Sequence, residues 1–235
     1  MSLRNKNVQI QNWGMQQYNS AWDKQEELLQ SIIEIKKSNR SLKTPKKTPN
    51  YLIFLQHHPV YSLGRSGDQS NLLIDKSILD KKGVDFIKSN RGGDITFHGP
   101  GQLVVYPVLD LDNFFTDIHK YLRTLENIII QTLNDFGIKG QRSSGETGVW
   151  LDAGTPFARK ICAMGIRASR WVTMHGFALN INTDLTYFEY IIPCGINGKG
   201  VTSMQREIGK KISFEKVISK IKIHFKNNFD AKLVI

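Results

Sequence analysis

The sequence contains few cysteines and no long apolar segment. Cys162 and Cys194 are the two thiols among 235 residues, too few for a disulfide framework or a thiol metal site in a domain of this size. Each is therefore interpreted separately, as a packed side chain or as a reactive thiol. No apolar run approaches the ~20 residues of a transmembrane helix, and the N-terminus lacks the apolar stretch of a secretory signal. We expect a cytoplasmic protein with no membrane partner.

Acidic residues are also in the minority. The chain has 21 Asp plus Glu against 32 Lys plus Arg, a formal charge of +11, so its surface should attract acidic partners. The basic residues concentrate at positions 36–47 and 210–226, without the interleaved aromatic residues of single-strand binders. This pattern favours a solvated basic face, or a docking face for acidic proteins, over a nucleic-acid partner.

Length and periodicity predict one domain over residues 1–235, with an exposed basic loop at about 38–50 that carries two prolines. Apolar residues recur with helical spacing at 16–37, at 118–136 and from about 213. Thr116 or Asp117 can cap the second helix, and Gly137 ends it. Apolar or β-branched runs begin at Tyr51, Leu103, Ile161 and Trp171 and indicate strands. The expected fold class is α/β (α+β), a mixed sheet with helices on one side.

A glycine-rich segment at 91–102, RGGDITFHGPGQ, is the first candidate for chemistry. Glycines let backbone approach a ligand closely, while Arg91 and His98 can supply polar contacts. The alternative is a tight turn between two strands. The segment matches neither the GxGxxG pattern nor a phosphate-binding P-loop.

The segment at 160–181, KICAMGIRASRWVTMHGFALNI, holds three further candidates. Lys160 directly precedes an apolar strand, so its ammonium needs a partner or a route to the surface. Cys162 lies inside the apolar run and is interpreted as a core thiol. His175 is either a polar site residue or a hydrogen-bonded core histidine.

Cys194 has a different setting, in the sequence IIPCGING. A thiol held between proline and glycine after an apolar run suits a nucleophile, and a buried small residue is the alternative. No histidine is close to it in sequence, so a histidine partner would have to be His98 or His175, brought near by the fold.

Taken together, these motifs resemble the lipoyl(octanoyl) transferase family. The resemblance runs in order through HHPVYSLGR from His57, the segment from Arg91, GVWL from Gly148, the segment from Lys160, and IIPCGI followed by GVTSM from Gly200. It implies a fold similar to the catalytic domains of biotin and lipoate protein ligases. It also implies octanoyl-acyl carrier protein as donor. The implied acceptors are the lipoyl domains of 2-oxoacid dehydrogenase E2 subunits and the glycine cleavage H protein. No cofactor or metal is required.

The resemblance also assigns residues to roles. The acyl-thioester cysteine falls on Cys194 and its partner lysine on Lys160, while Asp94 stands where many members carry glutamine. The substrate-binding positions are Arg91, Gly92, Gly93, Asp94, Ile95, Thr96, Phe97, His98, Ala163, Met164, Gly165, Gly176, Phe177 and Ala178.

Elementary acid–base chemistry agrees with the catalytic pair. A thiol with an ordinary pKa of about 8.5 is a few per cent ionised at neutral pH, so a nearby ammonium raises the reactive fraction. An acceptor lysine with an ordinary pKa of about 10.4 must lose a proton to a base, and neutral Lys160 is the candidate. One rival is an ATP-dependent lipoate or biotin protein ligase, which needs no Cys194. The other is a non-catalytic module that binds a carrier or nucleic acid.

Overall fold

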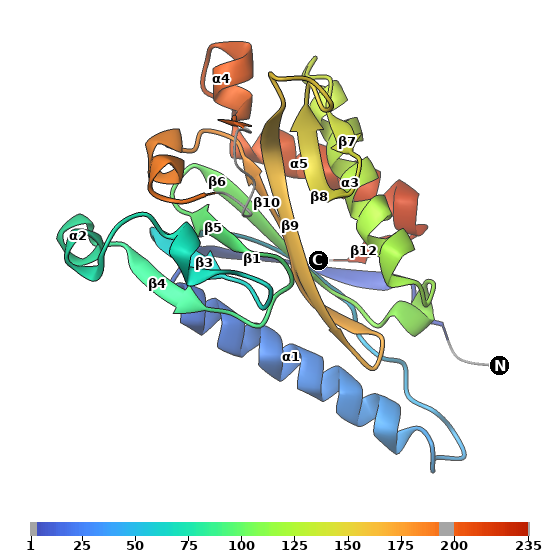
Figure 1. Cartoon of the computed structure of the whole chain (residues 1–235). Coiled ribbons are helices and arrows are strands. Elements are labelled where there is room, and N and C mark those ends of the chain that lie inside the picture. The colour runs from blue at the N-terminus through green and yellow to red at the C-terminus, as the bar shows by residue number, and fades with distance from the viewer. Residues whose placement is uncertain (1–3, 193–199, 235) are drawn as a thin grey trace.

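The computed structural model describes residues 4–192 and 200–234. A nine-stranded mixed sheet forms its centre, in the order β12-β1-β2-β6-β10-β9-β8-β7, with β11 paired to β9 (Figure 1). These strands are β1 (Asn7–Gln16), β2 (Tyr51–His57), β6 (Gln102–Val108), β7 (Gln141–Ser143), β8 (Glu146–Leu151), β9 (Arg159–Ser169), β10 (Val172–Asn180), β11 (Gly200–Val201) and β12 (Lys232–Val234).

A smaller sheet of three strands stands beside the large one, in the order β4-β3-β5. It consists of β3 (Val60–Leu63), β4 (Asp85–Lys88) and β5 (Ile95–His98). Its core includes Tyr61, Ile95 and Phe97, which pack against the 3-10 helix η3 (Leu185–Tyr190). Short helical segments complete the connections: η1 (Gln69–Asn71), α2 (Lys76–Lys82), η2 (Leu111–Asn113) and α4 (Met204–Ile208).

Three longer helices form where the apolar periodicity predicts them: α1 (Tyr18–Ser38), α3 (Ile118–Asn134) and α5 (Phe214–Phe229). The Asp117 and Ser213 side chains accept hydrogen bonds from Lys120 N and Lys216 N and so cap α3 and α5. Gly137 follows α3 with φ +76°, in the left-handed region that suits glycine.

The helices cover both faces of the large sheet, whereas the sequence led us to expect them on one face. Leu29 and Ile32 of α1 pack with Ile53 and Val104 on one face, and α3 and α5 pack over the other (Figure 1). The expectation was wrong because helical periodicity shows that a helix has an apolar side but does not show which face of a sheet receives it.

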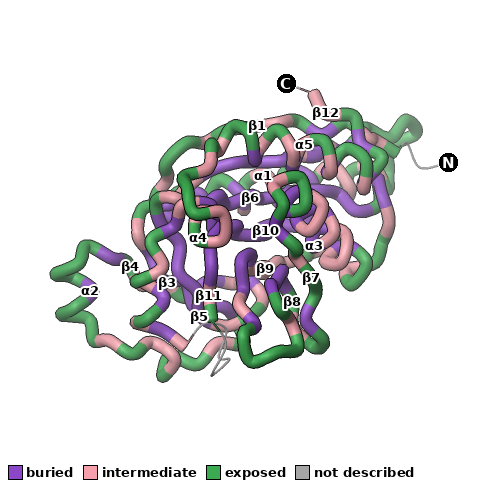
Figure 2. Tube along the Cα trace, turned by 90° about the horizontal axis from the view of Figure 1, so that it is seen from above, coloured by how far each residue is buried: buried purple, intermediate pink, exposed green. Residues whose placement is uncertain are grey.

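Burial follows these layers. Figure 2 shows β6 and β10 buried in the interior, while the outer sides of the helices are exposed.

The basic loop is exposed over residues 41–47, but Thr48 and Asn50 are buried beside Asp110. Lys36, at the end of α1, bonds Asp110 at 2.5 Å and Asp112 at 2.8 Å. Among the described helices, none is long and apolar enough to cross a membrane.

Candidate active site

A cavity of about 530 Å³ opens between β9, β10 and the loop that leads into β5. Its walls bring together most of the residues that the sequence analysis assigned to substrate binding. Those that line it are Arg91, Gly92, Gly93, Asp94, Thr96, His98, Ala163, Met164, Gly165, Gly176, Phe177 and Ala178, together with Lys160. These residues come from three separate stretches of the chain, so the fold creates the site.

Ile95 and Phe97 lie elsewhere. Successive side chains of a strand point to opposite faces, and on β5 it is Thr96 and His98 that face the cavity. Ile95 and Phe97 are buried in the core of the small sheet, where the Phe97 ring stacks on Tyr187 at 4.4 Å between centroids. These two side chains therefore pack in the small sheet and are not among the residues that line the cavity.

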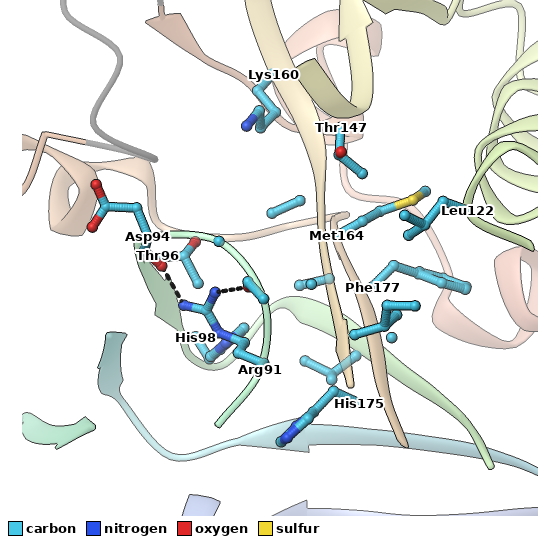
Figure 3. Close-up of a pocket in the computed structure, with 18 of the residues that line it drawn as sticks. Arg91, Asp94, Thr96, His98, Leu122, Thr147, Lys160, Met164, His175 and Phe177 are labelled. Carbon is cyan, nitrogen blue, oxygen red and sulfur yellow. Dashed lines mark hydrogen bonds between the residues drawn. The ribbon is translucent and has the colours of Figure 1, made fainter. Parts of the chain in front are cut away.

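Arg91 holds one wall of the cavity in place. Its buried guanidinium donates to the carbonyl oxygens of Ser62 at 2.5 Å, Asp94 at 2.7 Å and Gly92 at 3.0 Å (Figure 3). Nε also donates to Ser62 Oγ at 3.2 Å. Buried donors and acceptors are costly unless paired, so these bonds fix the loop against β3. We call the surface formed by Arg91, Asp94, Thr96, His98 and His175 the polar wall.

Close backbone approach explains two of the predicted glycines. Gly92 N donates to Ile166 O at 2.9 Å, which brings the loop onto the edge of β9. A Cβ on Gly165 would stand 2.5 Å from Gly92 O, closer than real contacts allow. Gly93 has φ +86°, a conformation that side chains disfavour. This segment is therefore a tight turn that forms one wall of the cavity, and its contact with a ligand stays a prediction.

Asp94 connects the polar wall to the chain ahead of Cys194. Its Oδ1 accepts from Ile95 N at 2.6 Å, and its Oδ2 accepts from Asn71 Nδ2 at 2.6 Å. The carbonyl of Asn71 in turn accepts from Ile192 N at 2.8 Å. Asp94 is thus tied by two hydrogen bonds to the last described residue of that segment.

Three histidines cluster at the inner end of the cavity. His98 lies between Gln102 Oε1 at 2.8 Å and Ser62 Oγ at 3.2 Å. His57 Nε2 lies 2.7 Å from Tyr106 Oη. Burial lowers the pKa of His57 to about 4 and places the pKa of His98 well below its usual value. Both imidazoles are therefore neutral at pH 7.

His175 is both buried and part of the cavity, so both sequence interpretations apply. Its Nε2 lies 2.7 Å from Asn90 Oδ1. Its φ of +58° is unusual for a strand residue, and its backbone N donates to Gln25 Oε1 at 2.8 Å. Burial first, and then the charges of Arg91 and Arg167, lower the pKa of His175 to about 3.

The second wall is apolar. Met164 and Phe177 are direct partners in the β9–β10 pairing, and Leu122 of α3 faces them (Figure 3). Ala163 and Ala178 form the next pair along the same strands. Because successive side chains of a strand point to opposite faces, we call the surface formed by Leu122, Met164 and Phe177 alone the apolar wall. It presents to the cavity the kind of surface that an alkyl chain covers favourably.

Several lining residues were missed by the sequence analysis: Tyr18, Val104, Tyr106, Leu122, Gly145, Glu146, Thr147 and Ile166. Leu122 is one of the apolar residues that recur with helical spacing at 118–136 and form an apolar stripe, yet it is only partly buried and lines the cavity. Its place at the margin of that stripe was the one available signal. The others come from helix, strand and turn positions that are brought together by contacts distant in sequence.

Lys160 stands at the cavity end of β9 with 8% of its surface exposed. Its Nζ lies 4.6 Å from the centroid of the Trp150 ring. Lys160 is therefore a buried cavity residue, and the alternative of snorkelling to the surface is wrong.

Cys162 lies two residues further along β9. It is fully buried, and burial raises the pKa of its thiol, as expected for a core cysteine.

Cys194 lies outside the described residues. The chain on either side of that segment is described. Ile192 bonds Asn71, and β11 pairs in parallel with β9, with Gly200 opposite Arg159 and Val201 opposite Lys160. Thr202 N then donates to Lys160 O at 3.0 Å.

Comparison with known proteins identifies the family. The model of the lipoyl protein ligase A/B catalytic domain matches residues 17–226. The chain belongs to this family. Relatives of the same family that are named octanoyltransferase include proteins from Flavobacterium psychrophilum (59% identical over 98% of this chain and 100% of that protein), Christiangramia forsetii (59%, 97% and 98%) and Cytophaga hutchinsonii (53%, 91% and 88%).

Solved structures show that the lipoyl protein ligase fold extends to distant sequences. Lipoate-protein ligase A bound with ATP superposes with a TM-score of 0.66 at 15% identity, covering 98% of this chain and 90% of that chain. A bipartite lipoate protein ligase from Thermoplasma acidophilum, studied with its E2 lipoyl domain, gives 0.62 at 16%, covering 99% and 88%. The expected ligase-like α+β fold is confirmed.

Proposed function

We propose that this chain is an octanoyltransferase that moves an octanoyl group from octanoyl-acyl carrier protein, through a thioester on Cys194, to a lysine of a lipoyl domain. The observation that carries the acyltransferase activity is the 59% identity, over nearly the full length of both chains, to proteins named octanoyltransferase. The net charge of +11 supports an acidic carrier as donor.

In the first half-reaction the Cys194 thiolate attacks the carbonyl carbon of the donor thioester. A new C–S bond forms, the donor's C–S bond breaks, and the donor leaves as a thiol by taking the proton of the Lys160 ammonium, which leaves Lys160 neutral for the second half-reaction. The ammonium of Lys160 stabilises the attacking thiolate. The apolar wall, with Leu122, Met164 and Phe177, receives the alkyl chain.

In the second half-reaction the acceptor lysine attacks the Cys194 thioester. An amide C–N bond forms, the C–S bond breaks, and neutral Lys160 takes the proton that the amine must lose. Both half-reactions exchange one acyl bond for another, so neither needs a nucleotide. The return of the chain to β9 at Gly200 and Val201, beside Lys160, supports the pairing of Lys160 with Cys194.

An ATP-free transfer assay tests this function. Purified chain is incubated with octanoyl-acyl carrier protein and a lipoyl domain, without ATP, and the mass of the lipoyl domain is measured. We expect one octanoyl group per lipoyl domain. Transfer that occurs only with free octanoate and ATP would instead identify the ligase activity, and no transfer in either case would favour a non-catalytic module.

A further inference from the structure

We infer that Trp150 is a positioning residue for the transfer, because the face of its ring attracts and locates the Lys160 ammonium. The inference rests on the proposed function of Lys160 in both half-reactions. A cation within about 6 Å of an aromatic centroid is attracted by the negative face of the ring, most strongly by tryptophan. Lys160 Nζ lies 4.6 Å from the Trp150 centroid.

A shift in strand register creates this contact. Val149 of β8 pairs with Cys162 of β9, but the next residue, Trp150, pairs with Lys160. Ile161 is therefore an extra residue on β9, which is the arrangement of a β-bulge. Residues directly opposite each other in an antiparallel pair present their side chains on the same face. The bulge thus sets the Trp150 ring beside the lysine side chain.

Burial makes the contact stronger than a surface pair. Trp150 is 2% exposed and Lys160 8%, so little water competes for the ammonium, and cation–π attraction rises as the pair is desolvated. The lysine stem also packs against Gly148, where a Cβ would stand at an ordinary contact distance of 3.7 Å from Lys160 Cε but only 2.6 Å from Cys162 O. The ring therefore both attracts the charge and limits where it can lie.

Other charged groups surround Lys160 on the neighbouring elements. On α3, Glu126 is fully buried, and its carboxylate accepts from Arg123 Nη1 at 2.7 Å, Arg142 Nε at 3.0 Å and Gly148 N at 3.1 Å. On β9, the adjacent Arg159 pairs with Glu207 at 2.7 Å and with Asp152. The cavity also holds Glu146, Arg91, Asp94, His98 and His175, and β9 also carries the Cys162 thiol and Arg167. These charged groups stay the same when Trp150 is replaced by the fluorinated tryptophans described below. A change in rate across those variants therefore reports on the ring.

The ring acts with opposite sign on the two half-reactions. Loading of Cys194 needs the lysine as a cation, which the ring attracts. Transfer needs the neutral amine as base, to which a cation–π contact contributes nothing. A weaker attraction between the Trp150 ring and the ammonium should therefore slow the loading of Cys194 and leave the transfer step unchanged or faster. Loss of packing or displacement of Lys160 would slow both steps, so the two explanations give different results.

Fluorinated tryptophans placed at position 150 alone test this inference. Each added fluorine withdraws electron density from the face of the ring and leaves its shape nearly unchanged. Cys194 loading from octanoyl-acyl carrier protein and amide formation from the preloaded thioester are followed separately in single turnovers. We expect loading to fall stepwise with fluorine number, by roughly 2- to 30-fold across the series, without a fall in transfer. The same series at the more exposed Trp171 is the matched control and should change neither rate.

Three outcomes separate the claims. If the unmodified chain loads normally and the loading rate is equal across the fluorinated series, the role of Trp150 is overturned but the proposed function is not. Parallel falls in both half-reactions would also overturn it, because they indicate a packing effect. Failure of the unmodified chain to acquire an octanoyl group would contradict the proposed function itself, and this inference with it.

Discussion

The polar and apolar walls of the cavity are held by different forces. In the polar wall, Arg91 and Asp94 bond backbone groups, and His98 has a hydrogen-bond partner at each ring nitrogen. In the apolar wall, Leu122 and Met164 are only partly buried and have flexible side chains. Hydrogen bonds have strict geometry, whereas apolar contact does not. The polar wall should therefore fix the shape of the site, and the apolar wall should adapt to the length of the acyl chain.

Lys160 belongs to neither wall, and its replacement should have the largest effect on activity. We expect Lys160→Ala to slow both half-reactions by about 10²-fold or more, as for a general acid–base group. Lys160→Arg keeps a charge that can stabilise the thiolate, but a guanidinium does not give up its proton at working pH. It should load Cys194 in part and transfer poorly, which single-turnover assays measure. Transfer by Lys160→Arg at the unaltered rate would exclude Lys160 as base, and His98 and His175 would be tested next.

Removal of Arg91 should break the polar wall. Arg91→Met removes a donor from the carbonyl oxygens of Ser62, Gly92 and Asp94, of which Asp94 O keeps a bond from Gly64 N at 3.3 Å. Buried acceptors that lose a partner cost about 1–3 kcal/mol each, so we expect a loss of roughly 3 kcal/mol in the free energy of unfolding, measured with urea. The exposed Arg170→Met is the control and should stay within about 0.5 kcal/mol. Equal effects of the two substitutions would show that Arg91 does not fix the wall.

The buried histidines in the polar wall and beside it should make the folded chain sensitive to acid. The pKa of His57 is about 4 and that of His175 about 3 in the folded chain, while the unfolded value is near 6.5. Between pH 6.5 and about 4 the unfolded state therefore binds protons that the folded state does not, and stability falls as pH falls. The slope is at most about 1.4 kcal/mol per pH unit for each histidine.

Urea unfolding at a series of pH values measures this slope. His57→Gln should flatten the dependence by up to one proton. Arg91→Met should flatten it further at His98 and His175, because the charge of Arg91 contributes to lowering both pKa values. A stability profile that is the same in the His57→Gln chain as in the unaltered chain would contradict the assignment.

Shortening Leu122 should change selectivity more than stability. Leu122→Ala enlarges the space beside the apolar wall. One methylene of a substrate in an apolar pocket is worth about 1–3 kcal/mol of discrimination between substrates. We expect the ratio of kcat/KM for decanoyl to octanoyl donors to rise several-fold. Leu125→Ala, at a fully buried position of the same helix, should cost about 2–5 kcal/mol of stability and leave the ratio unchanged. An unchanged ratio in Leu122→Ala would place the alkyl chain elsewhere.

The sequence predicted the long helices of the fold better than its strands. Periodicity located α1, α3 and α5, since a helix that packs on a core repeats its apolar residues every 3.6 positions. It missed β1, in which buried and exposed residues do not alternate regularly and the pairing with β2 shifts between Asn12 and Gly14. The small sheet was missed as well, because its strands are four residues long and their pairing depends on contacts distant in sequence.

Within the site, motif segments located the polar wall but did not resolve it residue by residue. The family resemblance covered 91–98 as a block, although strand alternation turns Ile95 and Phe97 into the core. Leu122 lies outside the motifs and reaches the cavity through the packing of α3 against β8 and β9. Side chains that meet only through packing between elements cannot be found from local sequence.

The thioester on Cys194 is the central claim, and intact-protein mass spectrometry tests it most directly. The chain is incubated with octanoyl-acyl carrier protein, without ATP and without an acceptor, alongside Cys194→Ala and Cys162→Ala. We predict one added octanoyl group on the unaltered chain and on Cys162→Ala, because the buried Cys162 thiol has a raised pKa and stays protonated. Cys194→Ala should gain none. Equal labelling of Cys194→Ala would contradict the account and place the nucleophile on another residue.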